Sequence, residues 1–204
     1  MLPFVGLVAA YLIGSSPFSY VAGRLLRGID LRQHGSGNLG ATNVYRTLGA
    51  PAAIAVLLLD GAKGALPVLA FPSLTGLGGP WWAAAAGVSA IVGHVRPYFG
   101  MFKGGGKGVA TASGVFAALA PIPFAAAFAT FVLVVALTRY VSLGSMLGAA
   151  ALAATVAIRD GIASPLGATA IAIAVFVVWT HRSNIGRLRR GEESRLGRPG
   201  GAGR

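Results

Sequence analysis

The sequence predicts an all-α integral membrane protein with seven transmembrane helices, its N-terminus outside and its C-terminus in the cytoplasm. Hydrophobic residues make up 55% of the 204-residue chain, charged residues only 11%, and the mean hydropathy is +0.72. A soluble domain carries about a quarter charged residues. Apolar runs approaching the roughly 20 residues that cross a hydrocarbon core recur along the whole chain. The basic residues gather in alternate connections, as in a multi-pass protein.

The first apolar run lacks a basic leader and continues through Pro17 into Arg24, so we interpret it as a retained span and not as a cleaved signal. The stretch 108–138 is short for two crossings and fits either a tilted pair or a re-entrant hairpin. The predicted spans are residues 3–25, 46–70, 80–96, 108–121, 122–138, 143–159 and 163–181.

The positive charges set the orientation. Of the 17 basic residues, all but Lys63 and Arg159 fall in connections assigned to the inner side or in the C-terminal segment. The net charge of +12 is therefore explained by membrane topology, and we expect no nucleic-acid partner. Residues 1–188 form the predicted polytopic domain, and residues 189–204 a basic cytoplasmic tail that we expect to be disordered and close to anionic lipids.

The first polar segment on the inner side spans residues 34–46. Its glycines let the backbone turn tightly and approach a ligand, and Arg46 offers a guanidinium fork suited to an oxyanion. The alternative is a polar connector with ordinary helix capping, but the density of hydrogen-bonding side chains beside an arginine favours an anion-binding loop. The candidate residues are Ser36, Gly37, Asn38, Thr42, Asn43 and Arg46.

The second segment carries three consecutive glycines between two lysines and opens onto an apolar run. It resembles a phosphate cradle in kind but is not a Walker A loop, because Met101 stands where that pattern needs glycine and Gly108 where it needs serine or threonine. The pattern indicates phosphate binding without nucleotide hydrolysis. The alternative is a flexible basic loop that contacts lipid phosphates. The candidate residues are Lys103, Gly104, Gly105, Gly106 and Lys107.

The third segment ends the last predicted span. His181 and Asn184 are three residues apart and would share a helix face. The alternative for His181 is a histidine at the membrane interface whose hydrogen bonds are made to solvent. Ser142 is a weaker candidate on the same side of the membrane.

Asp60 and Lys63 lie within the second predicted span with i, i+3 spacing, so they can form an ion pair. Ionisable residues inside membranes are functional candidates, and a salt bridge that orients the loops is the alternative. We group His94 with them as a structural or coupling residue.

The chain has no cysteine and only five acidic residues, so it offers neither thiolate ligands nor a cluster typical of a metal site. No acidic residue lies beside His94 or His181 in sequence to suggest a catalytic triad. We therefore expect no metal and no cofactor, and catalysis by positioning and fixed positive charge.

Together these segments resemble the bacterial acyl-phosphate:glycerol-3-phosphate acyltransferases, over nearly the whole chain. The resemblance rests on GSGNLGATN at residues 35–43 with Arg46, on Asp60 with Lys63, on His94, on GKGVAT at residues 106–111, on Ser142, and on His181 with Asn184. It departs from the usual pattern by one extra glycine before Lys107, which leaves Lys103 as a secondary candidate.

The resemblance implies a multi-pass enzyme of the bacterial inner membrane whose active site faces the cytoplasm. Its substrates would be a fatty acyl phosphate and sn-glycerol 3-phosphate, and it would begin phospholipid biosynthesis, working as a monomer among membrane lipids. By motif, the catalytic and phosphate-binding set would be Ser36, Arg46, Lys107, His181 and Asn184, with Asn38, Thr42, Asn43, the glycine run and Ser142 lining the substrates.

Two other functions compete with this interpretation. A transporter for an organic phosphate would need similar anion-binding loops, but also access from both sides and often repeated halves, which the sequence lacks. A lipid-binding scaffold would explain the basic loops, but not the serine, asparagine and histidine residues gathered on the same side.

Overall fold

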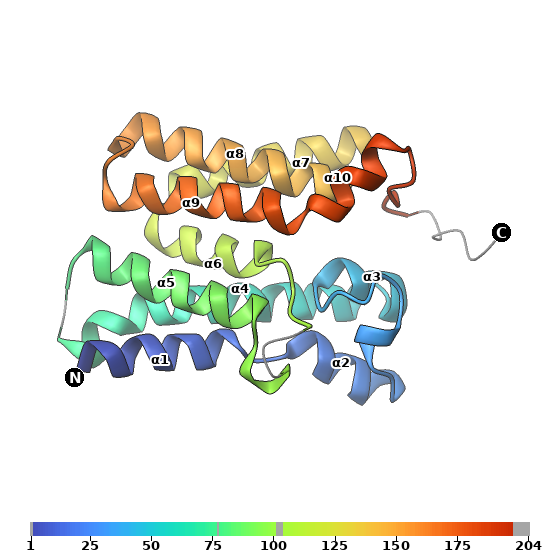
Figure 1. Ribbon diagram of the computed structural model, residues 1–204, viewed down its shortest axis with the longest axis horizontal. Coiled ribbons are helices and arrows are strands. Elements are labelled where there is room, and N and C mark those ends of the chain that lie inside the picture. The colour runs from blue at the N-terminus through green and yellow to red at the C-terminus, as the bar shows by residue number, and fades with distance from the viewer. Residues whose placement is uncertain (1, 77, 101–103, 198–204) are drawn as a thin grey trace. The chain divides into compact units, whose positions relative to one another are not determined.

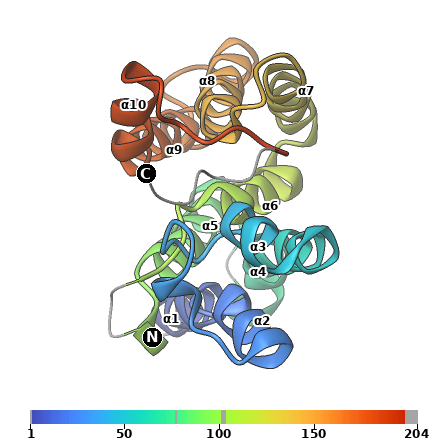
Figure 2. The same cartoon turned by 90° about the vertical axis from the view of Figure 1, so that its right-hand side faces the viewer.

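The computed structural model describes residues 2–76, 78–100 and 104–197, and within these ranges every regular element is a helix. The predicted all-α class is therefore confirmed. The chain divides into two compact units, Met1–Leu119 and Ala120–Arg204, which we describe one at a time. Figure 1 labels their helices in chain order, and Figure 2 views most of them nearly end-on.

The first unit is a bundle in which α4 packs against α1, α5 and α6, while α1 also packs along α5. The shorter α2 and α3 lie beside one another and both contact α4. The described elements of this unit are α1 (Leu2–Gly14), α2 (Phe18–Arg27), η1 (Leu31–Gln33), α3 (Ala41–Leu48), α4 (Ala50–Thr75), α5 (Pro80–Val95), η2 (Tyr98–Gly100) and α6 (Val109–Leu119).

Glycine lets these helices approach until their backbones touch. A Cβ on Gly14 of α1 would overlap the backbone of Ala90 on α5, and a Cβ on Gly64 of α4 would overlap the carbonyl oxygen of Thr111 on α6. At the same crossing, Gly114 of α6 meets the carbonyl oxygen of Gly61. Because lipid tails are as apolar as leucine, close packing of small residues is what holds such helices together.

The second unit consists of α7 (Pro121–Thr138), α8 (Val141–Asp160), α9 (Pro165–Thr180) and α10 (Arg182–Arg189), with α8 packed against both α7 and α9. Proline opens α7 and α9, where its missing N–H costs nothing. The hydroxyl of Ser164 caps α9 by accepting a hydrogen bond from the Gly167 N–H at 2.9 Å.

Four helical stretches are long and apolar enough to cross a membrane, and the bent pair of α9 and α10, which turns by 55°, makes a fifth if it is counted as one. The four are Leu2–Arg27, Ala50–Pro72, Pro121–Thr138 and Val141–Asp160. Large apolar side chains such as Leu58, Leu137 and Ile158 are exposed on them, as a lipid-facing surface requires. With 16 and 11 residues, α5 and α6 are shorter than the usual span of about 20, so the seven crossings stay a prediction.

The structure corrects two predicted boundaries. The span predicted over residues 3–25 is two helices, broken between Gly14 and Phe18, because Pro17 cannot donate the backbone hydrogen bond that would continue the helix. The span predicted over 46–70 begins instead at Ala50, since Gly49 has φ +92°, a conformation that a continuous helix cannot hold.

Replacing Gly114 by alanine tests the close crossing of α4 and α6. Alanine favours an isolated helix by roughly 1 kcal/mol over glycine, but the added methyl group would press on the backbone of Gly61, and overpacking costs about 1–3 kcal/mol. We expect Gly114→Ala to lower the thermal unfolding temperature of the detergent-solubilised protein. Gly78→Ala is the control, because a Cβ there meets no atom within 4 Å. Equal unfolding temperatures for the two variants would contradict this account of the crossing.

Candidate functional site

The loop between η1 and α3 is held from within by the amide of Asn43, whose side chain is buried. Its Nδ2 donates to the carbonyl oxygens of Leu31 at 3.2 Å and His34 at 3.0 Å, while its Oδ1 accepts from the Ser36 N–H at 2.9 Å. Gly35 takes φ +61°, and a Cβ there would overlap the Asn43 amide. Asn43 therefore shapes the loop, while Ser36 lies exposed on it.

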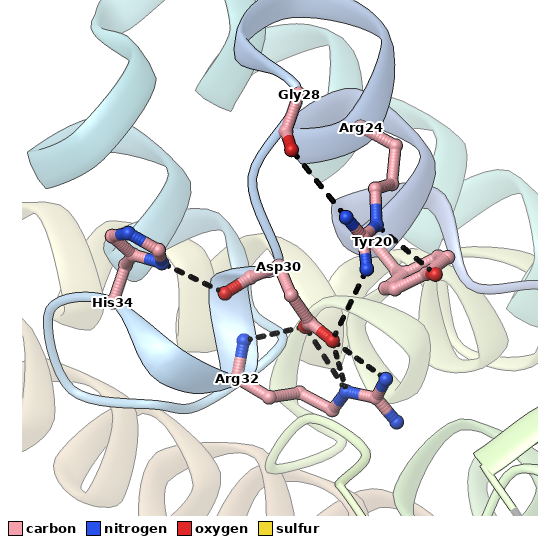
Figure 3. A network of polar contacts seen from close by, with 6 residues as sticks. All are labelled: Tyr20, Arg24, Gly28, Asp30, Arg32 and His34. Atoms are coloured by element: carbon pink, nitrogen blue, oxygen red, sulfur yellow. Dashed lines mark hydrogen bonds and ion pairs between the residues drawn. The ribbon is translucent and has the colours of Figure 1, made fainter.

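A network of ion pairs anchors the start of this loop (Figure 3). The carboxylate of Asp30 accepts hydrogen bonds from the Arg32 N–H and from the Arg32 guanidinium, with Nη2 2.7 Å from Oδ2. The guanidinium groups of Arg24 and Arg32 lie 5.3 and 5.2 Å from the ring centre of Tyr20. A ring nitrogen of His34, Nδ1, lies 2.9 Å from the Asp30 carbonyl oxygen. The network fixes the direction in which the chain enters the loop.

The Arg32 guanidinium also sets the charge of this carboxylate. Asp30 lies in the connection after α2, and its hydrogen bonds from the Arg32 side chain hold its pKa at about 2, below the usual 3.8. Asp30 is therefore ionised at any physiological pH. Sequence analysis missed it, although its position two residues before an arginine was the available signal.

The glycine run that precedes Lys107 lies against the end of α5 and against the first loop. The Gly106 N–H donates to the carbonyl oxygen of His94 at 3.2 Å, and a Cβ on Gly105 would overlap the carbonyl oxygens of His94 and Val95. A Cβ on Gly104 would stand 3.0 Å from Cδ of Arg32, and one on Gly106 3.0 Å from the carbonyl oxygen of Leu39. The structure thus brings the loop of Ser36 and the loop of Lys107 into contact, whereas Lys103 lies outside the described residues.

The predicted pairing of Asp60 and Lys63 is confirmed. Their Oδ1 and Nζ atoms are 2.7 Å apart within α4, and both side chains are buried. Lys63 also donates to the carbonyl oxygen of Ser16, at 2.8 Å, where the chain breaks between α1 and α2. Nδ1 of the buried His94 lies 3.7 Å from the same carboxylate oxygen.

In the second unit, His181 caps the end of α9. Its Nδ1 lies 2.8 Å from the carbonyl oxygen of Val177, and because a carbonyl only accepts, Nδ1 must carry the proton. In the neutral ring Nε2 is then the basic nitrogen. The helix bends at this point, and His181 stands at the junction between α9 and α10, the helix that contains Asn184.

Glu193, which sequence analysis missed, joins three side chains of the second unit. Its Oε1 accepts hydrogen bonds from the Ser142 hydroxyl at 2.7 Å and from Asn184 Nδ2 at 2.6 Å, and its Oε2 pairs with Arg187 at 2.7 Å. Burial alone would raise the pKa of Glu193, but the hydrogen bonds from Asn184, Ser142 and Arg187 outweigh that effect and lower the pKa below its usual 4.5. Glu193 belongs to the predicted basic tail.

The comparisons with known proteins agree with this arrangement. Residues 4–191 match the family model described as glycerol-3-phosphate acyltransferase. The chain is 50% identical to the glycerol-3-phosphate acyltransferase of Geobacter sulfurreducens, over 92% of this chain and 94% of that protein. It is 45% identical to the glycerol-3-phosphate acyltransferase of Halalkalibacterium halodurans, over 94% of each.

Two solved structures have the same fold. Both are crystal structures of PlsY (YgiH), an integral membrane glycerol 3-phosphate acyltransferase. The glycerol 3-phosphate form is 37% identical and aligns over 96% of both chains with a TM-score of 0.87. The lysophosphatidic acid form is 36% identical and aligns over 96% of this chain and 95% of that one, with a TM-score of 0.85.

The apolar helices and the glycine-shaped basic loops define a multi-pass membrane enzyme that acts on an anionic substrate. The chain belongs to the glycerol-3-phosphate acyltransferase family and is an acyltransferase of lipid metabolism. The transporter interpretation is not supported. The roles of individual site residues stay predictions.

The pH dependence of stability tests the Glu193 cluster. Because the pKa of Glu193 is lower in the folded protein than in the unfolded chain, its stabilising effect is complete above the unfolded value and is lost as the pH falls through the folded value. We expect Glu193→Gln to lower the unfolding temperature at neutral pH, and its difference from the unaltered protein to shrink on acidification below 4.5.

Glu192→Gln is the matched control. Glu192 pairs with Arg190 at the same distance of 2.7 Å, but both side chains are more than half exposed, and exposed pairs contribute about 0–1 kcal/mol. An equal loss of stability in both variants, or a Glu193→Gln difference that does not change with pH, would contradict the buried cluster.

Proposed function

We propose that this acyltransferase moves a fatty acyl group from a fatty acyl phosphate to the 1-hydroxyl of sn-glycerol 3-phosphate. The products are 1-acylglycerol 3-phosphate, or lysophosphatidate, and inorganic phosphate. The observation that carries the proposal is the contact between two loops, each shaped by glycine and each accompanied by a basic residue. Such an arrangement suits two substrates that both carry phosphate. The glycerol 3-phosphate and lysophosphatidic acid forms of PlsY support the acceptor and the product.

The reaction needs no covalent enzyme intermediate, because an acyl phosphate is already an activated anhydride. The 1-hydroxyl oxygen of the acceptor attacks the acyl carbonyl carbon, a new ester C–O bond forms, and the bond between that carbon and the phosphate oxygen breaks. The hydroxyl proton passes to a base, and inorganic phosphate leaves with the bonding electron pair. The protein supplies position and positive charge for these steps.

Arg46 and Lys107 hold the phosphate groups and neutralise the charge that develops on the departing one. Ser36, Asn38 and Thr42 contribute neutral hydrogen bonds from the first loop, and the glycine run sets the position of Lys107. Asn184 and Ser142 also bind the substrates. The exposure of Ser36 in the loop and of Arg46 in α3 supports these roles.

His181 accepts the proton of the attacking hydroxyl. The hydrogen bond from its Nδ1 to Val177 supports this role, because it directs the lone pair of the neutral ring to Nε2. The phosphate of the acceptor is the alternative base. The acyl chain lies between helices, where burial contributes about 0.8 kcal/mol per methylene.

The chain crosses the bacterial inner membrane seven times as a monomer, with its N-terminus outside and its active site facing the cytoplasm. In this topology α1 and α2 together form the first crossing. The other six are α4, α5, α6, α7, α8 and α9. The concentration of Lys and Arg on the inner side supports the orientation. The short α6 packs against α4, which supports the assignment of α6 as a crossing that is covered by other helices.

Phosphate release in detergent tests the reaction, since a transporter has no compartments to work between. Given palmitoyl phosphate and glycerol 3-phosphate, the purified protein should release phosphate and form lysophosphatidate in equal amounts, the latter identified by mass spectrometry. Arg46→Ala and Lys107→Ala should each lower the rate about 100-fold or more, the usual effect of removing a charge-stabilising group. Arg159→Ala is the control and should retain the rate. Absence of turnover with either palmitoyl phosphate or acyl-CoA would refute the proposal.

The base is tested separately. His181→Ala should lower kcat by about 100-fold or more if the imidazole takes the proton, with the protein still folded and monodisperse. His181→Gln keeps a side chain of similar reach without a comparable base and should be equally slow. Retention of most activity in either variant would instead assign the proton to the phosphate of the acceptor.

A further inference from the structure

The buried group formed by Asp60, Lys63 and His94 has no part in the chemical steps above. The three residues are 2%, 5% and 6% exposed. Taking charges out of water costs several kcal/mol per ion, and apolar residues of similar volume often replace a buried ion pair without loss of stability. Stability alone therefore does not explain why this group is charged.

Contacts of Lys63 with the connection between α1 and α2 hold the ion pair in place. Lys63 Nζ is 2.7 Å from Asp60 Oδ1 and donates to the Ser16 carbonyl oxygen at 2.8 Å. It also lies 5.4 Å from the ring centre of Phe18, at the start of α2. With its position set by α4 and by the break between α1 and α2, the Asp60 carboxylate is a rigid negative point 3.7 Å from Nδ1 of His94.

His94 connects this group to the glycine run. Its backbone carbonyl oxygen accepts from the Gly106 N–H at 3.2 Å, and a Cβ on Gly106 would overlap Nε2 of its ring. The imidazole therefore touches Asp60 on one edge and Gly106 on the other. Gly106 is the residue directly before Lys107.

Packing around the ring is incomplete on one side. A small cavity beside it is lined by Ser19, Asp60, Lys63, His94 and Gly106, among other residues of the first unit, and has about 10 Å³ open to the centre of a water-sized sphere. That is near the lower limit for one water molecule. The contact with the fixed carboxylate therefore helps to determine where the ring sits.

We propose that His94 is a positioning residue for the phosphate-binding loop, and that the Asp60–Lys63 pair acts on Lys107 through the His94 ring. The inference rests on the proposed function only in assigning phosphate binding to that loop. Loss of the imidazole removes the side-chain contact that supports Gly106, and Lys107 then samples positions away from the phosphate.

Hydrogen exchange tests the positioning without reference to activity. In His94→Gln, amide exchange should speed up in a peptide covering residues 104–108, while exchange in α1 and α5 and the unfolding temperature stay unchanged. Ser89→Ala is the matched control from the same helix, where Ser89 Oγ donates to the Leu7 carbonyl oxygen at 2.7 Å. It should leave residues 104–108 unchanged. Unchanged exchange at residues 104–108 in His94→Gln, or a general rise that includes α1 and α5, would overturn the proposal.

Kinetics test whether the Asp60–Lys63 pair acts on Lys107 through the His94 ring. The double variant Asp60→Asn with Lys63→Met removes the pair without leaving a lone buried charge. It and His94→Gln should each lower kcat/KM by about tenfold or more, the scale expected of a misplaced binding group. Combining all three changes should lower kcat/KM no further than either alone, since both act through one contact. Independent, multiplying losses would overturn the proposal.

If the double variant does not fold, the exchange comparison with His94→Gln decides alone. If the unaltered protein transfers no acyl group, the proposed function fails, while the exchange comparison still decides whether His94 positions the loop.

Discussion

A charged group carried into this apolar bundle needs a partner inside the protein, and the first unit depends on how that requirement is met. Lipid offers no hydrogen bonds, so an unsatisfied group there costs several kcal/mol. At the break between α1 and α2, Lys63 donates to the carbonyl oxygen of Ser16, while its charge is balanced by Asp60. One ion pair thus closes a helix break and ties α4 to the connection that leads into α2.

Glycine serves two different purposes in this structure. At the crossing of α4 and α6 it removes side chains so that two backbones can touch, which binds the helices. In the run before Lys107 the same absence of a side chain lets the loop lie on the end of α5 and against Arg32. The second use depends on the first, because the loop can be placed reproducibly only if α5 and its neighbours are rigid. The extra glycine relative to the usual family pattern is consistent with this packing, since all three glycines lie against other atoms of the protein.

Local patterns in the sequence predicted much of this fold and part of the site. Hydropathy located the long helices, and i, i+3 spacing predicted the contact between Asp60 and Lys63, because both signals arise within one helix. The break at Pro17 was passed over because the apolar run continues through it. The cluster around Glu193 had no local signal, since Ser142 lies 51 residues away in sequence. Long-range contacts of this kind depend on how separate helices pack, which spacing along the chain does not encode.

Four of the five acidic residues lie beside a basic side chain, and three of these pairs involve a buried carboxylate that helps to fix local geometry. Asp30, Asp60, Glu192 and Glu193 each lie within ion-pair distance of an arginine or lysine. A carboxylate left unpaired near a phosphate-binding loop would repel the substrate, whereas a paired one shapes the backbone and adds little net charge. Asp30 illustrates this, because its bond to Arg32 directs the chain into the loop of Ser36 while the pair stays neutral overall. The net charge of +12 is then available to attract anionic substrates.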